Sequence, residues 1–299
     1  MTIQSKGEIV RIARRIVKIT NPAKVLFPRD GITKLELVEY YRRIAPTILP
    51  YLRGRPLAMQ RSPDGIEGPG FFEKNARPYY PDWIQIVPIP KQKGLVRHVI
   101  CNDSATLVYL ANLAVITPHA WLSRVDKLEN PDQMIFDLDP SDEDFRTVCT
   151  AAKRLREQLK ARGLASFVKS TGSRGLHVLV PLDRHAKFDQ VRAFARDVAA
   201  QLAESDPEHL TTEVRKSKRQ GRIFVDTARN AYAQTAAPPY AVRPRDGAPV
   251  ATPLNWNELD SRSLTPDRFN IRNIFDRLEK IRDPWKDLKK YSQRIPLET

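Results

Sequence analysis

The chain has 299 residues, of which 41% are hydrophobic and 28% are charged. This composition excludes a disordered chain, and the length is sufficient for one large or two modest domains with a hydrophobic core. Fifty lysines and arginines against 35 acidic residues give a formal net charge of +15. A positive excess of this size favours a polyanionic partner, nucleic acid ahead of a membrane surface, with a generally basic protein as the alternative.

Cysteine usage and hydropathy indicate the cellular setting. The two cysteines, Cys101 and Cys149, form no C-x-x-C pair, which is typical of a reducing compartment and argues against a structural zinc site. The first residues lack the apolar stretch of a signal peptide, and no apolar run is long enough to span a bilayer. We therefore expect a cytoplasmic, nucleoid-associated protein that does not enter a membrane.

Hydrophobic periodicity and turn residues predict the elements in chain order. Strands are expected over residues 8–19, 57–61, 134–139, 166–169, 178–181 and 223–226. Helices are expected over residues 33–48, 103–116, 144–162, 188–203 and 269–281. Thr33 and Glu36 form a capping box that starts the first helix, and Gly163 ends the third. The sequence contains no internal repeat or long linker, so one domain is favoured.

Two lysines, Lys24 and Lys34, flank the turn that precedes the first helix. Near a helix N-terminus they would form a cradle for a phosphate, because the backbone amides and the helix dipole there favour an anion. A pair of ordinary surface lysines is the alternative, and these residues alone leave both interpretations open.

An aromatic pair follows a loop rich in proline and glycine. Phe71 and Phe72 lie beside Lys74 and Arg77, and rings among basic side chains are typical of a platform on which nucleic-acid bases stack. Packing of one ring in the core is the alternative. Burial of both is disfavoured, because neighbouring residues on a strand face opposite ways.

Residues 134–140, Met-Ile-Phe-Asp-Leu-Asp-Pro, end an apolar strand with two carboxylates. Side chains alternate along a strand, so Asp137 and Asp139 share one face. Adjacent carboxylates raise each other's pKa, and Mg²⁺ or Mn²⁺ relieves the repulsion because hard cations prefer oxygen ligands. For an isolated pair, two acids on the wet face of an edge strand are an equal alternative.

The turn 170–177, Ser-Thr-Gly-Ser-Arg-Gly-Leu-His, joins two predicted strands. Its glycines permit a close approach of the backbone, and Ser173, Arg174 and His177 supply hydrogen-bond donors. The turn is not a P-loop, because it lacks G-K-[ST] before a helix. Capture of a phosphate explains both features, whereas a tight hairpin, the alternative, explains the glycines alone.

A later strand ends in another acid, Asp226. A third carboxylate would complete a two-metal site. The basic run 215–222 precedes it, and Arg229 and Arg243 follow it. Arginines this close to a carboxylate site suit a triphosphate or a nucleic-acid backbone.

Three motifs occur in order: Asp-Leu-Asp-Pro at 137–140, Ser-Thr-Gly-Ser-Arg-Gly-Leu-His at 170–177 and Ile-Phe-Val-Asp-x-x-Arg-Asn at 223–230. Together they resemble the archaeo-eukaryotic primase superfamily, and more narrowly the polymerase domain of bacterial DNA ligase D, which acts in non-homologous end joining. The resemblance covers nearly the whole chain. It extends to Thr-Asn-Pro-x-Lys at 20–24, Phe-Phe-x-Lys-Asn at 71–75 and Asp-Pro-Trp at 283–285.

The resemblance implies an α/β (α+β) primase-like fold, with an RRM-like antiparallel or mixed catalytic sheet flanked by helices and an N-terminal lobe. One domain would span residues 1–299, with a DNA-end-binding lobe over about 1–130 and the catalytic module and C-terminal helix over about 131–299. The implied activity is template-dependent nucleotidyl transfer that extends 3′ ends or fills gaps at double-strand breaks. The implied partners are DNA with recessed or gapped ends and a 5′-phosphate, ribo- or deoxyribonucleoside triphosphates, a Ku-type protein and an ATP-dependent DNA ligase.

The resemblance also implies roles for individual residues. Two Mn²⁺ or Mg²⁺ ions are implied on a catalytic triad of Asp137, Asp139 and Asp226. The nucleotide pocket would comprise Ser173, Arg174, Gly175, His177, Arg219, Arg243 and His119. The base and template contacts would be Phe71, Phe72, Arg61 and Lys74. The pocket for the 5′-phosphate of a recessed end would comprise Asn21, Lys24 and Lys34.

Three positions depart from the family pattern. Arg174 stands where lysine is common, which keeps the charge and changes the geometry. Gln60 replaces a basic residue, and Ala241 stands where serine is frequent. None of these departures removes a metal ligand, so activity is expected.

Two other functions compete with polymerisation. A haloacid-dehalogenase-type phosphatase also carries D-x-D on a strand, but near the start of its domain and followed by Thr or Gly; here Pro140 and Ser141 follow, after a long N-terminal segment. A non-catalytic DNA-end-binding module is the alternative from another class. Three retained carboxylates argue against it, since an idle cluster of buried acids is costly.

Overall fold

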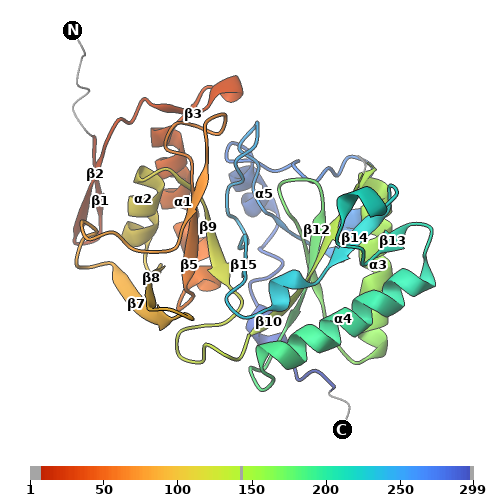
Figure 1. The fold of residues 1–299 in the computed structure, drawn as a ribbon. Helices are drawn as coiled ribbons and strands as arrows, with labels where there is room; N and C mark the ends of the chain where they lie inside the picture. The colour runs from red at the N-terminus through yellow and green to blue at the C-terminus, as the bar shows by residue number, and fades with distance from the viewer. Residues whose placement is uncertain (1–7, 142–143, 297–299) are drawn as a thin grey trace. The chain divides into compact units, whose positions relative to one another are not determined.

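The computed structural model describes residues 8–141 and 144–296, and the chain forms two compact units (Figure 1). The first unit comprises the residues up to Ala120 together with Ala237–Val250 and Asn270–Arg272; the second comprises Trp121–Ala236, Ala251–Phe269 and the residues from Asn273 onwards. The predicted division into a lobe and a catalytic module at about residue 130 stays a prediction. Within the described ranges, no helix has the length and apolar character that a membrane span requires.

The first unit is built around helix α1 (Lys34–Leu52), which packs against α2 (Ser104–Asn112). The predicted capping box is present: the Thr33 hydroxyl accepts from the Glu36 N–H at 3.3 Å, and the Glu36 carboxylate accepts from the Thr33 N–H at 2.8 Å. Helix α2 ends earlier than predicted, because Ala114 has a left-handed φ of 57° that turns the chain into the next strand.

The strands of the first unit pair antiparallel. They are β1 (Glu8–Ile12), β2 (Arg15–Ile19), β3 (Val25–Phe27), β4 (Ile32–Thr33), β5 (Leu57–Arg61), β6 (Phe71–Glu73), β7 (Gln85–Pro90), β8 (Leu95–Ile100) and β9 (Val115–Trp121). Strand β5 lies between β6 and β9. The single strand predicted over residues 8–19 is wrong: β1 and β2 form a hairpin, because Ala13, with a φ of 51°, reverses the chain.

Two buried tyrosines of α1 hold Ala237–Val250 in the first unit. The Tyr40 hydroxyl donates to the Tyr240 carbonyl at 2.7 Å. The Tyr41 hydroxyl accepts from the Val242 N–H at 3.1 Å. Because a buried hydroxyl without a partner is costly, these bonds fix the late segment of the chain against the early helix.

The second unit is built on a six-stranded sheet with the order β13-β14-β10-β12-β11-β16. Its strands are β10 (Gln133–Asp139), β11 (Phe167–Ser170), β12 (Leu176–Pro181), β13 (Leu210–Thr211), β14 (Ile223–Asp226) and β16 (Pro253–Leu254), and the short β15 covers Thr235–Ala236. The central β10 runs antiparallel to β12 and β14. Helices α3 (Phe145–Ala161) and α4 (Phe188–Ser205) pack against this sheet (Figure 1). The mixed sheet with flanking helices confirms the predicted fold class.

The alternation of side chains along β10 determines which face of the sheet is buried against the helices. Met134, Phe136 and Leu138 are completely buried in the core that α3 and α4 cover. Successive side chains on a strand point to opposite faces. Asp137 and Asp139 therefore lie on the face turned away from these helices.

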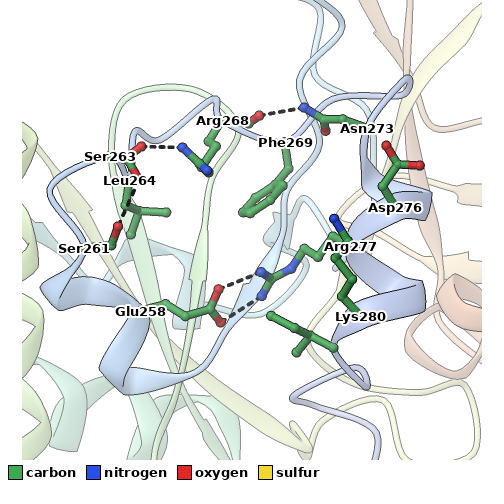
Figure 2. Close-up of a pocket in the computed structure, with 11 residues that line it drawn as sticks. Glu258, Ser261, Ser263, Leu264, Arg268, Phe269, Asn273, Asp276, Arg277 and Lys280 are labelled. Atoms are coloured by element: carbon green, nitrogen blue, oxygen red, sulfur yellow. Dashed lines mark hydrogen bonds and ion pairs between the residues drawn. The ribbon is translucent and has the colours of Figure 1, made fainter.

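The C-terminal helix is shorter than the predicted 269–281. Helix α5 covers Ile274–Lys280, and Asn270, which lies inside the predicted helix, instead makes an isolated β-bridge with Pro249. Phe269, which the periodicity placed on the apolar face of this helix, precedes it. Its ring packs against the Arg277 guanidinium at 4.5 Å (Figure 2).

The capping box of α1 gives a stability prediction. We expect Thr33→Ala to lower the free energy of unfolding by about 1 kcal/mol, because an N-terminal amide of the helix loses its acceptor. Urea unfolding followed by circular dichroism measures the change. Thr265→Ala, at an exposed threonine, is the control and should change the free energy by less than about 0.5 kcal/mol. Equal effects of the two substitutions would show that the cap contributes nothing.

Candidate active site

A row of polar side chains crosses the centre of the sheet in the second unit. Asp137 on β10 is directly opposite Asp226 on β14 and, on its other side, directly opposite His177 on β12. His177 is in turn opposite Lys169 on β11. Directly paired residues point to the same face, so the four side chains share one face. The structure thus brings together two predicted metal ligands and one predicted nucleotide-binding residue.

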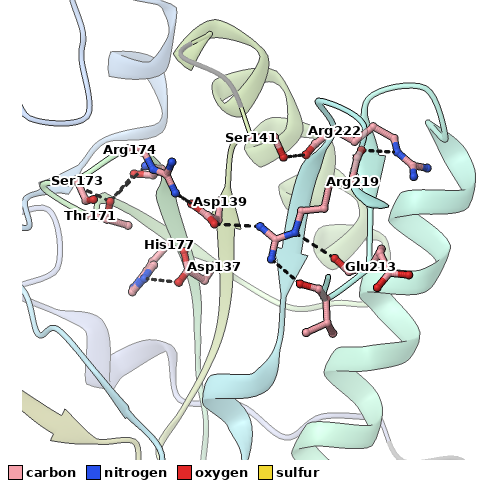
Figure 3. Close-up of polar contacts among 12 residues, drawn as sticks. Asp137, Asp139, Ser141, Thr171, Ser173, Arg174, His177, Glu213, Arg219 and Arg222 are labelled. Atoms are coloured by element: carbon pink, nitrogen blue, oxygen red, sulfur yellow. Dashed lines mark hydrogen bonds and ion pairs between the residues drawn. The ribbon is translucent and has the colours of Figure 1, made fainter. Parts of the chain in front are cut away.

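The Asp137 carboxylate is largely buried and stays ionised. Its Oδ2 lies 3.5 Å from Nε2 of His177 (Figure 3). Burial alone would raise the pKa of Asp137. His177, followed by the charges of Arg229 and Lys169, outweighs burial and brings the pKa to about 2.

His177 is neutral at neutral pH. Burial, together with the charge of Lys169, lowers the pKa of His177 to about 4. Its contact with Asp137 at pH 7 is therefore an N–H···O interaction, not an ion pair. The other ring nitrogen, Nδ1, is buried and has no hydrogen-bond partner among the described residues, which leaves one polar atom of the ring for a ligand.

Asp226 is perturbed in the opposite direction. Burial raises the pKa of Asp226, and the neighbouring charge of Asp137 raises it further, while the Ala228 N–H donates to Oδ1 at 2.7 Å. Two partly buried carboxylates on facing positions repel each other, which is the condition that a hard divalent cation relieves. The chemistry of this donor pair therefore fits Mg²⁺ or Mn²⁺.

Asp139 is engaged by two arginines. Arg174 Nη2 donates to its Oδ1 at 3.1 Å, and Arg219 Nη1 donates to its Oδ2 at 3.2 Å (Figure 3). Within residues 8–141 and 144–296, no three carboxylate, imidazole or thiol groups gather closely enough to hold a metal ion. The structure thus joins the third predicted metal ligand to two predicted phosphate-binding residues. The metal triad stays a prediction.

Arg219 is fixed by its surroundings and is only 8% exposed. Its Nε donates to the Glu213 carbonyl at 3.1 Å and its Nη2 to the Val214 carbonyl at 3.0 Å. The guanidinium lies 4.1 Å from the centre of the Phe224 ring, and Phe224 pairs directly with Asp139 across the strands. Arg219 therefore presents a positive charge at a defined position beside the carboxylates.

The turn between β11 and β12 is held close against β10. The Thr171 hydroxyl accepts from the N–H groups of Ser173 at 3.2 Å and Gly175 at 3.3 Å. Gly175 has no room for a side chain, because a Cβ there would lie 2.0 Å from the Leu138 carbonyl oxygen. The close approach sets Arg174 beside the acidic end of β10.

The residues predicted to contact base and template lie together in the first unit. Phe71 and Phe72 are 42% and 56% exposed, so neither ring packs in the core. The Arg61 guanidinium lies 5.5 Å from the centre of the Phe71 ring, and its Nη1 donates to Glu73 at 2.8 Å. Lys74 is exposed next to them.

Two residues of the predicted nucleotide pocket, His119 and Arg243, belong to the first unit. His119 Nε2 lies 3.0 Å from the Gln60 side-chain oxygen, and its ring centre lies 5.2 Å from that of Phe72. The Arg243 N–H donates to the Pro249 carbonyl at 2.8 Å. Their assignment to the nucleotide stays a prediction.

The three residues of the predicted 5′-phosphate pocket come together at the start of α1. The Lys34 N–H donates to the Lys24 carbonyl at 2.8 Å, and Asn21 turns the chain with a φ of 49°. Burial lowers the pKa of Lys34, and the charges of Lys24 and Arg61 act in the same direction. Asp64 binds the Lys24 ammonium at 2.8 Å. An added phosphate would relieve the repulsion between these cations.

Lys169 is not among the residues that the sequence predicts for the site, and Arg229 is predicted only as one of the arginines near the carboxylates that suit a triphosphate or a nucleic-acid backbone. Lys169 is 1% exposed and lies in the row of polar side chains that crosses the sheet. Alternation against the core residue Val168 places it on the polar face. The alternation of Val168 and Lys169 in the sequence shows that they lie on opposite faces of β11. Only the order of the strands shows that Lys169 lies on the same face of the sheet as Asp137.

A separate cavity of about 570 Å³ lies in the second unit, and no predicted site residue lines it (Figure 2). Arg277 forms a two-pronged ion pair with Glu258 in its wall, at 2.6 and 2.8 Å. This pair neutralises the most buried charge of the cavity. The sequence shows no motif at these positions.

The chain is similar to known proteins along most of its length. Residues 33–285 match the model of the family described as LigD, primase-polymerase domain. The chain is 34% identical to the multifunctional non-homologous end joining protein LigD of Pseudomonas aeruginosa over 95% of its own length. It is 31% identical to the bifunctional protein of that name from Bacillus subtilis over 97% of its length. The chain spans 34% and 48% of the length of these two relatives.

The fold is also similar to a solved structure, the polymerase domain of Mycobacterium tuberculosis ligase D in complex with DNA. The TM-score is 0.87 at 29% identity, and the similarity covers 93% of this chain and 99% of that one. Both comparisons confirm the resemblance and the fold class expected from the motifs. The chain belongs to the LigD primase-polymerase domain family.

Proposed function

We propose that this chain is a template-dependent nucleotidyltransferase of the primase type, which extends 3′ ends or fills gaps at double-strand breaks in non-homologous end joining. The observation that carries the proposal is the opposed pair Asp137 and Asp226 beside a turn that presents Arg174. Carboxylates alone suit many metal enzymes. Carboxylates joined to guanidinium groups suit the transfer of a nucleotide from a triphosphate.

Two Mg²⁺ or Mn²⁺ ions are proposed on Asp137, Asp139 and Asp226. When bound, such ions lower the pKa of the primer 3′-hydroxyl and neutralise the triphosphate and the leaving pyrophosphate. The protein's own contribution is a fixed set of oxygen atoms. Asp137 stays ionised, and the strand register holds Asp226 opposite it.

The contacts of Asp139 give a reason for nucleotide and cation to bind together. Arg174 and Arg219 neutralise Asp139 in the structure. A triphosphate is a stronger partner for guanidinium groups than one carboxylate, because it offers more charge and a matching geometry. Transfer of the two arginines to the triphosphate would release Asp139 for a cation.

The remaining proposed contacts follow the family pattern. Ser173, Gly175 and His177 would complete the triphosphate contacts, and Nδ1 of His177, which has no hydrogen-bond partner within residues 8–141 and 144–296, supports this role. His119 and Arg243 are proposed as nucleotide contacts on the family pattern alone. A Ku-type protein and an ATP-dependent DNA ligase are the proposed protein partners, since the relatives are named for end joining.

Loss of one carboxylate tests the proposed chemistry. We expect Asp137→Asn to reduce extension of a primer–template with Mn²⁺ and nucleotides by more than about a hundredfold, because several kcal/mol of charge stabilisation are removed. Asp197→Asn, at an exposed carboxylate of α4, should extend normally. A parent protein that binds DNA ends without extending them would instead favour the non-catalytic end-binding module, and normal extension by Asp137→Asn would exclude the assigned site.

The arginine contacts of Asp139 predict an unusual gain of binding. In the presence of EDTA, Asp139→Asn should bind a nucleoside triphosphate several-fold more tightly than the parent chain, because both guanidiniums lose the carboxylate that competes with the triphosphate. Calorimetry measures this affinity. Asp137→Asn is the matched control, because it removes one carboxylate charge that contacts His177 and not the two arginines. We expect a smaller gain of nucleotide affinity from it. An unchanged affinity in Asp139→Asn would contradict competition between the carboxylate and the triphosphate.

The lysine pocket predicts sensitivity to the 5′-phosphate. Removal of this phosphate from a recessed duplex end should weaken binding of the parent chain by about tenfold or more, because charge-assisted hydrogen bonds are lost. Lys34→Ala should bind both ends equally. Lys160→Ala, at an exposed lysine of α3, should keep the preference. Fluorescence anisotropy at fixed salt measures it, since phosphate contacts weaken as salt rises. A parent chain indifferent to the phosphate would rule the pocket out.

A further inference from the structure

The first unit carries an exposed aromatic ring beyond the pair that matches the family's template contacts. Tyr79 is 62% exposed, against 42% for Phe71 and 56% for Phe72. Aromatic side chains left in water on a basic protein are typical of surfaces that a partner covers. The sequence motifs assign no role to Tyr79.

Basic groups connect Phe71 to Tyr79. The Arg61 guanidinium lies 5.5 Å from the centre of the Phe71 ring, and it donates to one Glu73 oxygen at 2.8 Å. The other Glu73 oxygen accepts from Arg77, which lies two residues before Tyr79. Glu73 is only 6% exposed and pairs with both guanidinium groups, so it orients them and leaves the three groups with one net positive charge.

Tyr79 stands on a rigid support. Its ring centre lies 5.5 Å from that of Tyr80, and the Tyr80 ring lies 5.4 Å from that of Tyr109. Tyr109 in turn packs edge-on against Trp83 at 5.9 Å. Tyr80 is buried, and its hydroxyl donates to the Met59 sulfur at 3.8 Å. An exposed ring on a fixed base binds a ligand with little loss of conformational entropy.

The charge around these rings is positive. Lys74, Arg77 and Arg97 are exposed. The Arg97 N–H donates to the Asn75 side chain at 2.9 Å, which places β8 beside this segment. Asp82 is the exposed acid that follows in the sequence. With Arg61 and Glu73 included, four cations stand against two acids, and this positive excess favours a polyanion over an uncharged protein surface.

We propose that the Tyr79 surface, formed by Phe71, Arg77 and Tyr79, binds the single-stranded overhang of the template DNA. Tyr79 would stack on a base beyond those at Phe71 and Phe72, and Arg77 would contact the intervening phosphate. Rings interleaved with basic groups suit this ligand, because every base has a π-face and every linkage carries a charge. The identity of the strand as template rests on the proposed function, whereas single-strand binding itself does not.

The test compares duplexes with a recessed 5′-phosphate and a 3′ overhang of about two or about ten nucleotides. Fluorescence anisotropy gives the Kd for each. We expect Tyr79→Ala to weaken binding of the long overhang about tenfold, because one stacked base is lost, and to leave the short overhang unchanged. Tyr79→Phe keeps the ring and should bind both as the parent chain does.

Two further variants make the test specific. Tyr291→Ala removes a tyrosine that is 52% exposed in the second unit and should change neither Kd. Tyr79→Leu keeps apolar surface without a π-face, so it should behave like alanine. The proposal would be overturned if Tyr79→Ala bound the long overhang as tightly as the parent chain does. It would also be overturned if Tyr79→Leu, which lacks a π-face, bound the long overhang normally. Urea unfolding checks that each variant is folded.

Primer extension by the same proteins separates this inference from the proposed function. If the parent chain fails to extend a primer but loses overhang affinity on Tyr79→Ala, the polymerase assignment fails and the Tyr79 surface stands. If it extends primers but Tyr79→Ala binds both overhangs normally, the Tyr79 surface fails and the polymerase stands.

Discussion

The facing carboxylates of Asp137 and Asp226 are the constraint on which the second unit depends. Like charges directly opposite on neighbouring strands destabilise a sheet, and burial adds to the cost at Asp226. The unit offsets this with cations around the pair, including the buried Lys169 in the same row. Two arginines neutralise the nearby Asp139. The positive charge that makes the acids tolerable in the fold is also the charge that a polyphosphate ligand needs.

Strand register keeps these groups together. Burial of Phe136 and Leu138 beneath α3 and α4 fixes the face of β10, and a slip of one residue would exchange its dry and polar sides. Gly175 adds an independent restraint, because its backbone lies too close to Leu138 for any side chain. The hydrophobic core and the turn thus fix the carboxylates by packing alone, before any ligand contributes.

The sequence predicts the parts of the site that depend on local spacing. The period of two places Asp137 and Asp139 on one face, and the structure confirms the fold class around them. The sequence does not predict that Asp226 faces Asp137, because strand order is a property of the whole sheet. Local patterns also mislead where distant contacts override them, as in the hairpin within 8–19 and the shortened helix within 269–281.

The tyrosine anchors of α1 have a consequence for synthesis of the chain. Tyr40 and Tyr41 are buried against Ala237–Val250, which leaves the ribosome about two hundred residues later. A nascent chain that has completed only its N-terminal part can already bond the Tyr41 hydroxyl to the Ile116 carbonyl, but it leaves the Tyr40 hydroxyl and the Tyr41 oxygen without their partners on the late segment. The first unit acquires its last segment only after most residues of the second have emerged, so the order of synthesis is not the order in which the units are completed.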